Sequence, residues 1–148
     1  MEFNAEKCKV LVVTNTKWRW RSAHYYLGLD RLEVVEQFKY LGVEFRYNLS
    51  WKYMKANMLN KVEGMIPLVS KAANEGLNVK SCVKLWEQAL RPMLEYGVES
   101  WGLDKWDNAE RVQLEVGRRI LGVSSKMSNE VVRGELGWWT LKGRRDYL

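Results

Sequence analysis

The side chains that carry acid–base, nucleophilic or metal chemistry are few and widely separated in this sequence. His24 is the single histidine, and the cysteines Cys8 and Cys82 lie far apart, so the tight ligand spacing of a zinc site is missing. Phosphoryl transfer by two metal ions requires clustered carboxylates. The four aspartates are instead scattered over predicted loops and helix starts, at Asp30, Asp104, Asp107 and Asp146. We therefore expect no catalytic site and no metal site within this chain.

Cofactor binding and covalent catalysis also lack a sequence signal. Gly134 and Gly137 indicate the end of a helix, and no glycine-rich loop of the Walker or Rossmann type is present. His24 lies among aromatic residues, where a packed or surface histidine is a simpler interpretation than a general base. Two lone cysteines in an intracellular chain are usually buried thiols rather than a disulfide. We expect no cofactor.

The charge balance indicates nucleic acid as the leading partner. The chain has 24 Lys and Arg residues against 18 Asp and Glu, a formal charge of +6 and a pI near 9.3. Excess cations attract polyanions and release counterions from a phosphate backbone, although many basic proteins bind no nucleic acid. With 47% hydrophobic residues, the composition predicts a globular fold, either one domain or a small sheet attached to a helical bundle.

Indole and cationic side chains alternate between residues 17 and 21. On a strand, Trp18 and Trp20 would face one way, and Lys17, Arg19 and Arg21 the other. The indoles could stack on bases while the cations hold phosphates. The simpler interpretation is an amphipathic strand with packed indoles and solvated cations. Five other tryptophans are expected to anchor the core or the helix junctions: Trp51, Trp86, Trp101, Trp138 and Trp139.

No segment of the sequence is long and apolar enough to suggest a membrane helix. The longest apolar runs, such as Val10–Val13, fall far below the ~20 residues that a membrane span requires. The first residues do not resemble a signal peptide. We therefore expect no membrane partner and an intracellular location, in the nucleus or the cytoplasm.

The first third of the chain predicts strands. A buried strand is expected over residues 7–14, which are rich in β-branched side chains, and segment 17–21 suits a hairpin with it. Three further extended segments are expected at 25–29, 32–35 and 38–45.

From Ser50 onward, the apolar residues follow the spacing of helices. Ser50 is expected to cap the first helix, which should kink or break near Gly64 because Pro67 removes an internal hydrogen bond. Asn78 is expected to cap a second helix, and Pro92 should bend its last turn.

Two more helices are predicted from their end signals. Asp107 and Glu110 have the spacing of a capping box, which would open a third helix that ends at Gly122. Ser128 is expected to cap a shorter fourth helix that ends at Gly137.

An ordered series of motifs runs along the chain: FKYLGV at 38–43, LSW at 49–51, LRPMLEYG at 90–97, ERVQ at 110–113, RRILGV at 118–123 and ELGW at 135–138. It resembles the region just after the catalytic palm motifs of non-LTR (LINE-type) retrotransposon reverse transcriptases, from about Asn4 to the last residue. The fold class that follows is α+β. Residues 1–48 would form a small antiparallel sheet with hairpins, and residues 49–148 a mostly helical, thumb-like bundle.

The resemblance implies a surface that contacts nucleic acid. The family's primer grip would place the segment 38–42 beside a primer end, where Gly42 allows close approach of the backbone. The thumb would grip a template-primer duplex by its backbone. Arg118 and Arg119 suit either phosphate contact or compensation of the helix dipole. The expected binding residues are Lys7, Arg19, Arg21, Phe38, Lys39, Tyr40, Leu41, Gly42, Lys52, Lys55, Arg118 and Arg119.

Three functions remain open at this point. Because the metal-binding aspartates of such a polymerase would lie upstream of Met1, the first is a non-catalytic fragment that binds nucleic acid. The second is a protein-interaction module that self-associates through an exposed apolar surface. The third is a contribution of grip and thumb, in trans, to a separate RNA-directed DNA polymerase palm.

Overall fold

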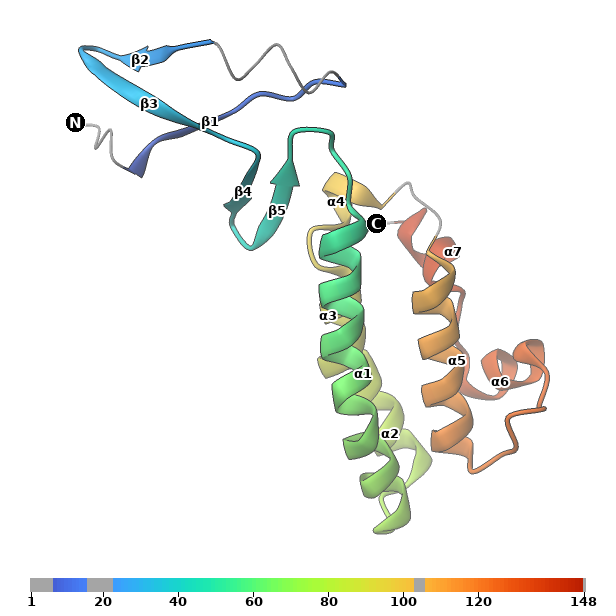
Figure 1. Ribbon diagram of the computed structural model, residues 1–148. Helices are drawn as coiled ribbons and strands as arrows, with labels where there is room; N and C mark the ends of the chain where they lie inside the picture. Colours follow the sequence, from blue (N-terminus) through green and yellow to red (C-terminus); the bar gives the residue numbers. More distant parts are fainter. Residues whose placement is uncertain (1–6, 16–22, 103–105, 148) are drawn as a thin grey trace. The chain divides into compact units, whose positions relative to one another are not determined.

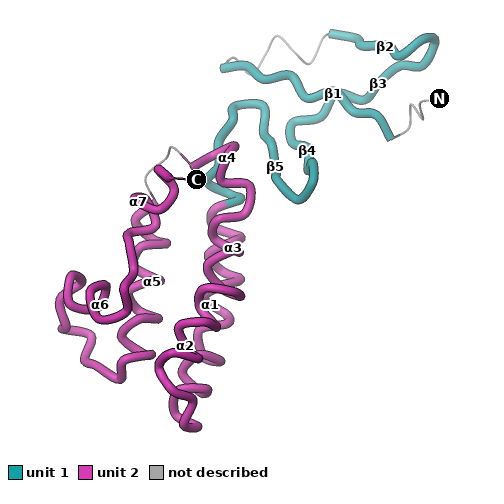
Figure 2. Tube along the Cα trace, turned by 180° about the vertical axis from the view of Figure 1, so that it is seen from behind, with its two compact units in different colours: residues 1–54 teal, residues 55–148 magenta. Residues whose placement is uncertain are grey.

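The computed structural model describes residues 7–15, 23–102 and 106–147 (Figure 1). The chain divides into two compact units, residues 1–54 and residues 55–148 (Figure 2). All the described strands lie in the first unit, and the second unit is helical. The α+β class, with strands preceding helices, is therefore confirmed.

The first unit contains a three-stranded sheet in the order β1–β3–β2. β2 (Tyr25–Leu27) pairs with β3 (Asp30–Val35) in the expected antiparallel sense, but β1 (Lys9–Leu11) pairs with β3 in parallel. β1 is also shorter than the buried strand expected over residues 7–14, and it is only partly buried. The segment 17–21, which was expected to pair with it, lies outside the described residues.

A separate antiparallel hairpin consists of β4 (Gln37–Tyr40) and β5 (Val43–Arg46). The expectation of one extended segment over 38–45 is therefore wrong, because the chain reverses at Leu41 and Gly42. Both residues have positive φ angles, 47° and 85°, as a type I′ turn requires. The local residue types did not indicate this turn, because leucine stands where Asn, Asp or Gly usually marks such a reversal.

Helix α1 (Lys52–Asn74) runs without a break through Gly64 and Pro67. The expectation of a break there is wrong. Proline removes a single helical hydrogen bond, and the packed apolar face on both sides of Pro67 keeps the helix continuous. Because the helix begins at Lys52, Ser50 lies one residue too early to be its cap. The buried apolar residues of α1 are Met54, Val62, Ile66 and Val69.

The second predicted helix changes its winding partway along. Asn78 caps it as expected, and its side-chain oxygen accepts a hydrogen bond of 2.8 Å from the backbone N–H of Ser81. A wider π-helical turn directly precedes Pro92, whose ring would clash with the carbonyl of Gln88 in a regular α-helix. Pro92 thus lies at the start of a new α-helical segment. The three segments are α2 (Val79–Leu85), η2 (Trp86–Leu90) and α3 (Arg91–Glu95).

The remaining helices include two that were predicted by their end signals. Ser128 caps α6, and its hydroxyl accepts a hydrogen bond of 3.3 Å from the N–H of Val131. Gly122 and Gly137 end α5 and α6 in the left-handed conformation, so these three expectations are confirmed. α4 and α7 were not expected. The bounds are α4 (Val98–Trp101), α5 (Asp107–Leu121), α6 (Asn129–Leu136) and α7 (Leu141–Arg145).

The expectation of a capping box at the start of α5 is wrong. Trp106 occupies the cap position without a side-chain hydrogen bond, and Asp107 is already the first helical residue. Glu110 turns away from the helix start to tertiary partners. Its carboxylate accepts a hydrogen bond of 3.0 Å from Arg133 and one of 2.9 Å from the backbone N–H of Lys142.

Tryptophan side chains form two pairs in the core of the second unit. The ring centroids of Trp86 and Trp138 lie 5.5 Å apart, and those of Trp101 and Trp106 lie 5.2 Å apart. Trp139 is 63% exposed, so its expected role as an anchor is wrong. Among the other expected anchors, Trp51 is half-buried, and the buried ones are Trp86, Trp101 and Trp138.

Gly117 is the point of closest approach between α5 and the segment that runs from α6 to Trp138. A Cβ atom on Gly117 would lie 2.7 Å from Val132, 3.0 Å from Leu136 and 3.1 Å from Trp138. Carbon atoms in favourable contact lie about 3.5–4.0 Å apart. This position therefore has room for glycine alone.

The substitution Gly117→Ala tests this close packing. We expect it to lower the free energy of unfolding by about 1–3 kcal/mol, because the added methyl overpacks the core. Gly134→Ala is a matched control at an exposed position of α6, since a Cβ there meets no atom within 4 Å. It should raise stability by up to ~1 kcal/mol through helix propensity. Urea denaturation measures both, and equal effects would refute the packing argument.

Candidate functional site

The exposed tip of the β4–β5 hairpin brings together four of the expected binding residues, Lys39, Tyr40, Leu41 and Gly42. Tyr40 and Leu41 are 59% and 74% exposed, and Lys39 is also exposed. Phe38 is half-buried and pairs with Phe45 in the strand register. The tip therefore presents an aromatic ring, an aliphatic side chain and a cation.

The backbone of this tip holds a non-glycine residue in a costly conformation. Leu41 has a φ angle of 47°, and the left-handed region costs a residue with a Cβ about 1–2 kcal/mol. Its exposed side chain gains little burial energy in return. Backbone strain of this kind occurs at binding sites and switch regions, so the tip is a candidate contact surface.

A groove along α5 gathers three arginines in the second unit. Arg111, Arg118 and Arg119 line it, together with Glu115, and it encloses about 520 Å³. Arg111 and Arg118 are seven residues apart, which is about two helical turns, so their side chains lie along one side of α5. Arg119 directly follows Arg118. Arg111 was not among the residues expected from the sequence. Its position seven residues before Arg118 was the signal that could have identified it.

Contacts within the protein hold Arg118 in place. Its Nη2 donates hydrogen bonds to the carbonyl of Met127 at 2.8 Å and to Oδ1 of Asn129 at 2.7 Å. These bonds tie the loop between α5 and α6 to the last turn of α5. A guanidinium has five N–H donors, so Arg118 retains donors for a further acceptor in the groove.

Arg119 and Arg111 are positioned in the same way. Arg119 donates to Oγ of Ser70 on α1 at 2.9 Å and pairs with Glu115 at 2.5 Å. Arg111 donates to the side chain of Asn108. Both arginines are exposed, and their guanidinium groups are ordered before any ligand arrives. Ordering in advance lowers the entropy cost of binding an anion.

Lys55 does not belong to this basic surface. It is 9% exposed, and its ammonium group lies 5.3 Å from the ring centroid of Trp101 and 5.9 Å from that of Trp106. A lysine held over two indole faces gains cation–π energy. The structure therefore gives no support to the phosphate contact that was expected for Lys55.

The other expected cations are dispersed. Lys7 is exposed just before β1, and Lys52 is the exposed first residue of α1. Arg19 and Arg21 lie outside the described residues.

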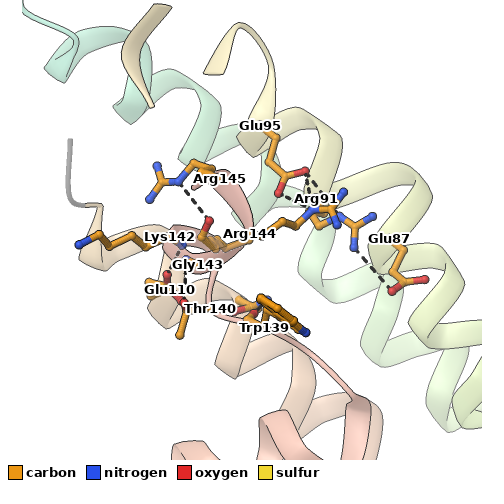
Figure 3. Close-up of polar contacts among 12 residues, drawn as sticks. Glu87, Arg91, Glu95, Glu110, Trp139, Thr140, Lys142, Gly143, Arg144 and Arg145 are labelled. Carbon is orange, nitrogen blue, oxygen red and sulfur yellow. Dashed lines mark hydrogen bonds and ion pairs between the residues drawn. The ribbon is translucent and has the colours of Figure 1, made fainter. Parts of the chain in front are cut away.

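A second set of polar contacts surrounds the C-terminal segment (Figure 3). The carboxylate of Glu95 lies between two arginines, 3.0 Å from Nε of Arg144 and 3.6 Å from Nε of Arg91. Arg91 also lies 3.6 Å from Glu87. The Glu95–Arg144 pair joins α7 to the η2–α3 segment, whereas the two contacts of Arg91 lie within that segment. The sequence pattern did not indicate the Glu95–Arg144 pair, because its partners are 49 residues apart in the chain. Arg91 lies only four residues from both Glu87 and Glu95.

Comparison of the chain with family models, with curated proteins and with solved structures finds no match. Among residues 7–15, 23–102 and 106–147, no group of three or more His, Cys, Asp or Glu side chains is placed to hold a metal ion. Within the same ranges, no helix has the length and apolar character needed to cross a membrane.

The contacts of Arg118 predict a structural effect that Arg111 should not share. Arg118→Ala removes three charge-assisted hydrogen bonds, two to the carbonyl of Met127 and one to Asn129, so we expect the free energy of unfolding to fall by about 1–2 kcal/mol. Arg111→Ala should change it by less than ~0.5 kcal/mol, because Arg111 lies on the exposed surface. Thermal or urea unfolding measures both. A larger loss for Arg111→Ala would contradict this assignment.

Proposed function

We propose that this chain binds nucleic acid through the phosphate backbone and does not itself catalyse a reaction, as a detached primer grip and thumb of a LINE-type reverse transcriptase would. The observation that carries this proposal is the groove along α5 with its three arginines. The exposed tip of the β4–β5 hairpin adds a second contact surface in the other unit.

The spacing of the arginines suits a sugar-phosphate backbone. Seven residues of an α-helix, from Arg111 to Arg118, span about 10 Å. This length equals about three base steps of 3.4 Å. Planar guanidinium groups can bind phosphate oxygens with two parallel hydrogen bonds. One carboxylate, that of Glu115, lies among them, and it is already paired with Arg119.

The hairpin tip suits contact with an exposed base or sugar. Tyr40 offers a ring for stacking, and Lys39 offers a cation to a neighbouring phosphate. Gly42 has a φ of 85° and no side chain, so a strand can approach its backbone closely. The hairpin therefore supports the same partner class as the groove does.

The described aspartates lie on separate elements of the chain. Asp30 begins β3, Asp107 begins α5 and Asp146 follows α7. Two-metal catalysis requires carboxylates from neighbouring elements to converge on metal ions about 3.5–4 Å apart. These three aspartates belong to different elements and include no such cluster.

Salt-dependent binding tests the proposal. We expect duplex DNA, RNA or an RNA–DNA hybrid to bind at ~50 mM salt and to dissociate steeply towards ~200 mM, because binding releases counterions. Arg111→Glu should reduce the slope of log K against log salt by about 1. Fluorescence anisotropy at several salt concentrations gives both quantities.

The matched control is Lys84→Glu, the same charge change at an exposed residue of α2 away from the groove. It should leave the slope nearly unchanged. An equal effect of the two substitutions would remove the groove from the proposal. Absence of binding to single strand, duplex and hybrid at low salt would refute nucleic-acid binding altogether.

A second candidate function is self-association through the sheet of the first unit. All three residues of β2 are exposed, and its neighbour Leu29 is 100% exposed. Tyr26, within β2, is 60% exposed. Exposed apolar side chains on a strand at the edge of a sheet favour pairing with another chain.

Sedimentation velocity over a range of protein concentrations tests this second function. We expect a species larger than a monomer to grow with concentration, and Leu29→Ser to shift the balance towards monomer. Leu68→Ser changes an apolar residue of α1 that is 57% exposed, and it should have no such effect. A single monomeric species at every concentration would exclude self-association.

A further inference from the structure

The second unit contains a cavity that none of the sequence motifs indicated. It lies against the π-helical turn η2 and the C-terminal segment, and it encloses about 430 Å³. Pockets of about 300–1,000 Å³ commonly hold small ligands. Trp86, Gln113 and Trp138 line it from the buried side, and Trp139, Tyr147 and Arg91 also contribute.

Several residues that line this cavity carry polar side-chain atoms without partners. Within the described residues, Nε1 of Trp86, Nε1 of Trp138, Oε1 of Gln113 and Nε of Arg91 have no hydrogen-bond partner. Each is closed off from solvent, so water at the surface does not satisfy it either. Buried polar groups in proteins nearly always have partners. Their concentration around one cavity therefore indicates a ligand that supplies the partners.

The orientation of Gln113 is determined by its neighbour. Its Nε2 donates a hydrogen bond of 3.1 Å to the carbonyl of Trp139. A carbonyl only accepts hydrogen bonds, so the amide cannot be reversed. Oε1 is thus left as an acceptor among three donors, namely the two indole N–H groups and Nε–H of Arg91.

The charges around the cavity balance one another. Arg91 and Arg144 are positive, and Glu87 and Glu95 pair with them (Figure 3). Arg91 lies 3.6 Å from each carboxylate, beyond hydrogen-bond distance. The site therefore suits a group without net charge that combines hydrogen-bond acceptors with a donor.

Two aromatic side chains at the mouth favour a planar ligand. Trp139 is 63% exposed and Tyr147 is 80% exposed, and their rings pack edge to face with centroids 5.3 Å apart. Exposed indole and phenol faces offer stacking surfaces for a flat ring. Because solvent does not reach the polar atoms in the walls, the ring must displace a side chain as it enters. Trp139 and Tyr147 are the exposed aromatic residues of the wall, and these side chains can move aside.

We propose that this cavity binds a single unstacked nucleobase. Ring nitrogens and exocyclic carbonyls of a base accept hydrogen bonds from the indoles and Arg91, and an exocyclic amine or ring N–H donates to Gln113. Trp139 stacks on the ring. This inference rests on the proposed function for the choice of a nucleobase among planar heterocycles. The base comes either from a free nucleoside or from an unpaired nucleotide of a bound strand.

Indole N–H signals in ¹H–¹⁵N NMR spectra test the proposal. Titration with adenosine, guanosine, cytidine and uridine should shift the signals of Trp86 and Trp138 for at least one nucleoside. Single Trp→Phe variants assign the signals of the eight tryptophans. The signal of Trp101 should stay in place, because its Nε1 already donates to the carbonyl of Tyr96 at 3.0 Å.

Variants at exposed residues separate ligand contact from folding. Trp139→Ala should weaken nucleoside binding about tenfold through loss of stacking. Tyr96→Ala removes another exposed ring of the same unit, 53% exposed and outside the cavity, and should leave binding unchanged. Absence of any shift at Trp86 and Trp138 with all four nucleosides at ~10 mM would overturn the proposal.

Two further ligands identify the group that is recognised and its source. Ribose 5-phosphate should not shift these indoles, and an equal shift with it would overturn recognition of a base. A single strand of about eight nucleotides that shifts them identifies a strand as the source, whereas shifts with nucleosides alone identify the free compound. Arg111→Glu should leave the nucleoside-induced shifts unchanged. The proposal for the cavity and the proposal for the groove can therefore be refuted independently.

Discussion

The architecture of the second unit depends on the contact at Gly117, where α5 has no side chain between itself and the next segment. Val132, Leu136 and Trp138 occupy the space that a Cβ would need. Because α6 lies this close, Trp138 comes within 5.5 Å of Trp86 and forms a wall of the aromatic cavity. The same placement brings the start of α6 next to the last turn of α5, where Asn129 and Arg118 meet in the groove.

One helix thus supports both proposed contacts, and its sequence separates them by angle. Successive residues of an α-helix are turned by about 100°, so Arg111 and Arg118 share a side that Gln113 does not. Gln113 is 3% exposed and reaches Trp139, while the arginines remain on the surface. A buried amide near the middle of α5 costs free energy unless both its donor and its acceptor are bonded. Helix α5 therefore contributes one buried side chain to the wall of the cavity and exposed arginines to the groove.

Local signals in the sequence predicted local features well. Asn78 and Ser128 cap helices because their side chains reach N–H groups three residues ahead, and Gly122 ends α5 because glycine tolerates a positive φ. Features that depend on contacts with residues far away in the chain could not be predicted from local signals. Glu110 has the spacing of a cap residue, yet Arg133 and Lys142 offered it better partners. The turn at Leu41 contradicts local preference altogether.

The contacts of the basic side chains show why net charge was a weak guide to the binding surface. Lys55 is buried against indoles, Arg133 pairs with Glu110, and Arg144 pairs with Glu95. Carboxylates neutralise the two arginines, and burial against the indoles removes Lys55 from the surface, so none of these three charges offers a contact to a polyanion. The arginines along α5 differ in that their ordered guanidinium groups share one surface with a single paired carboxylate. The case for a polyanionic partner therefore follows from the arrangement of a few arginines on one helix, and a formal charge of +6 alone would not distinguish this chain from a basic protein that binds no nucleic acid.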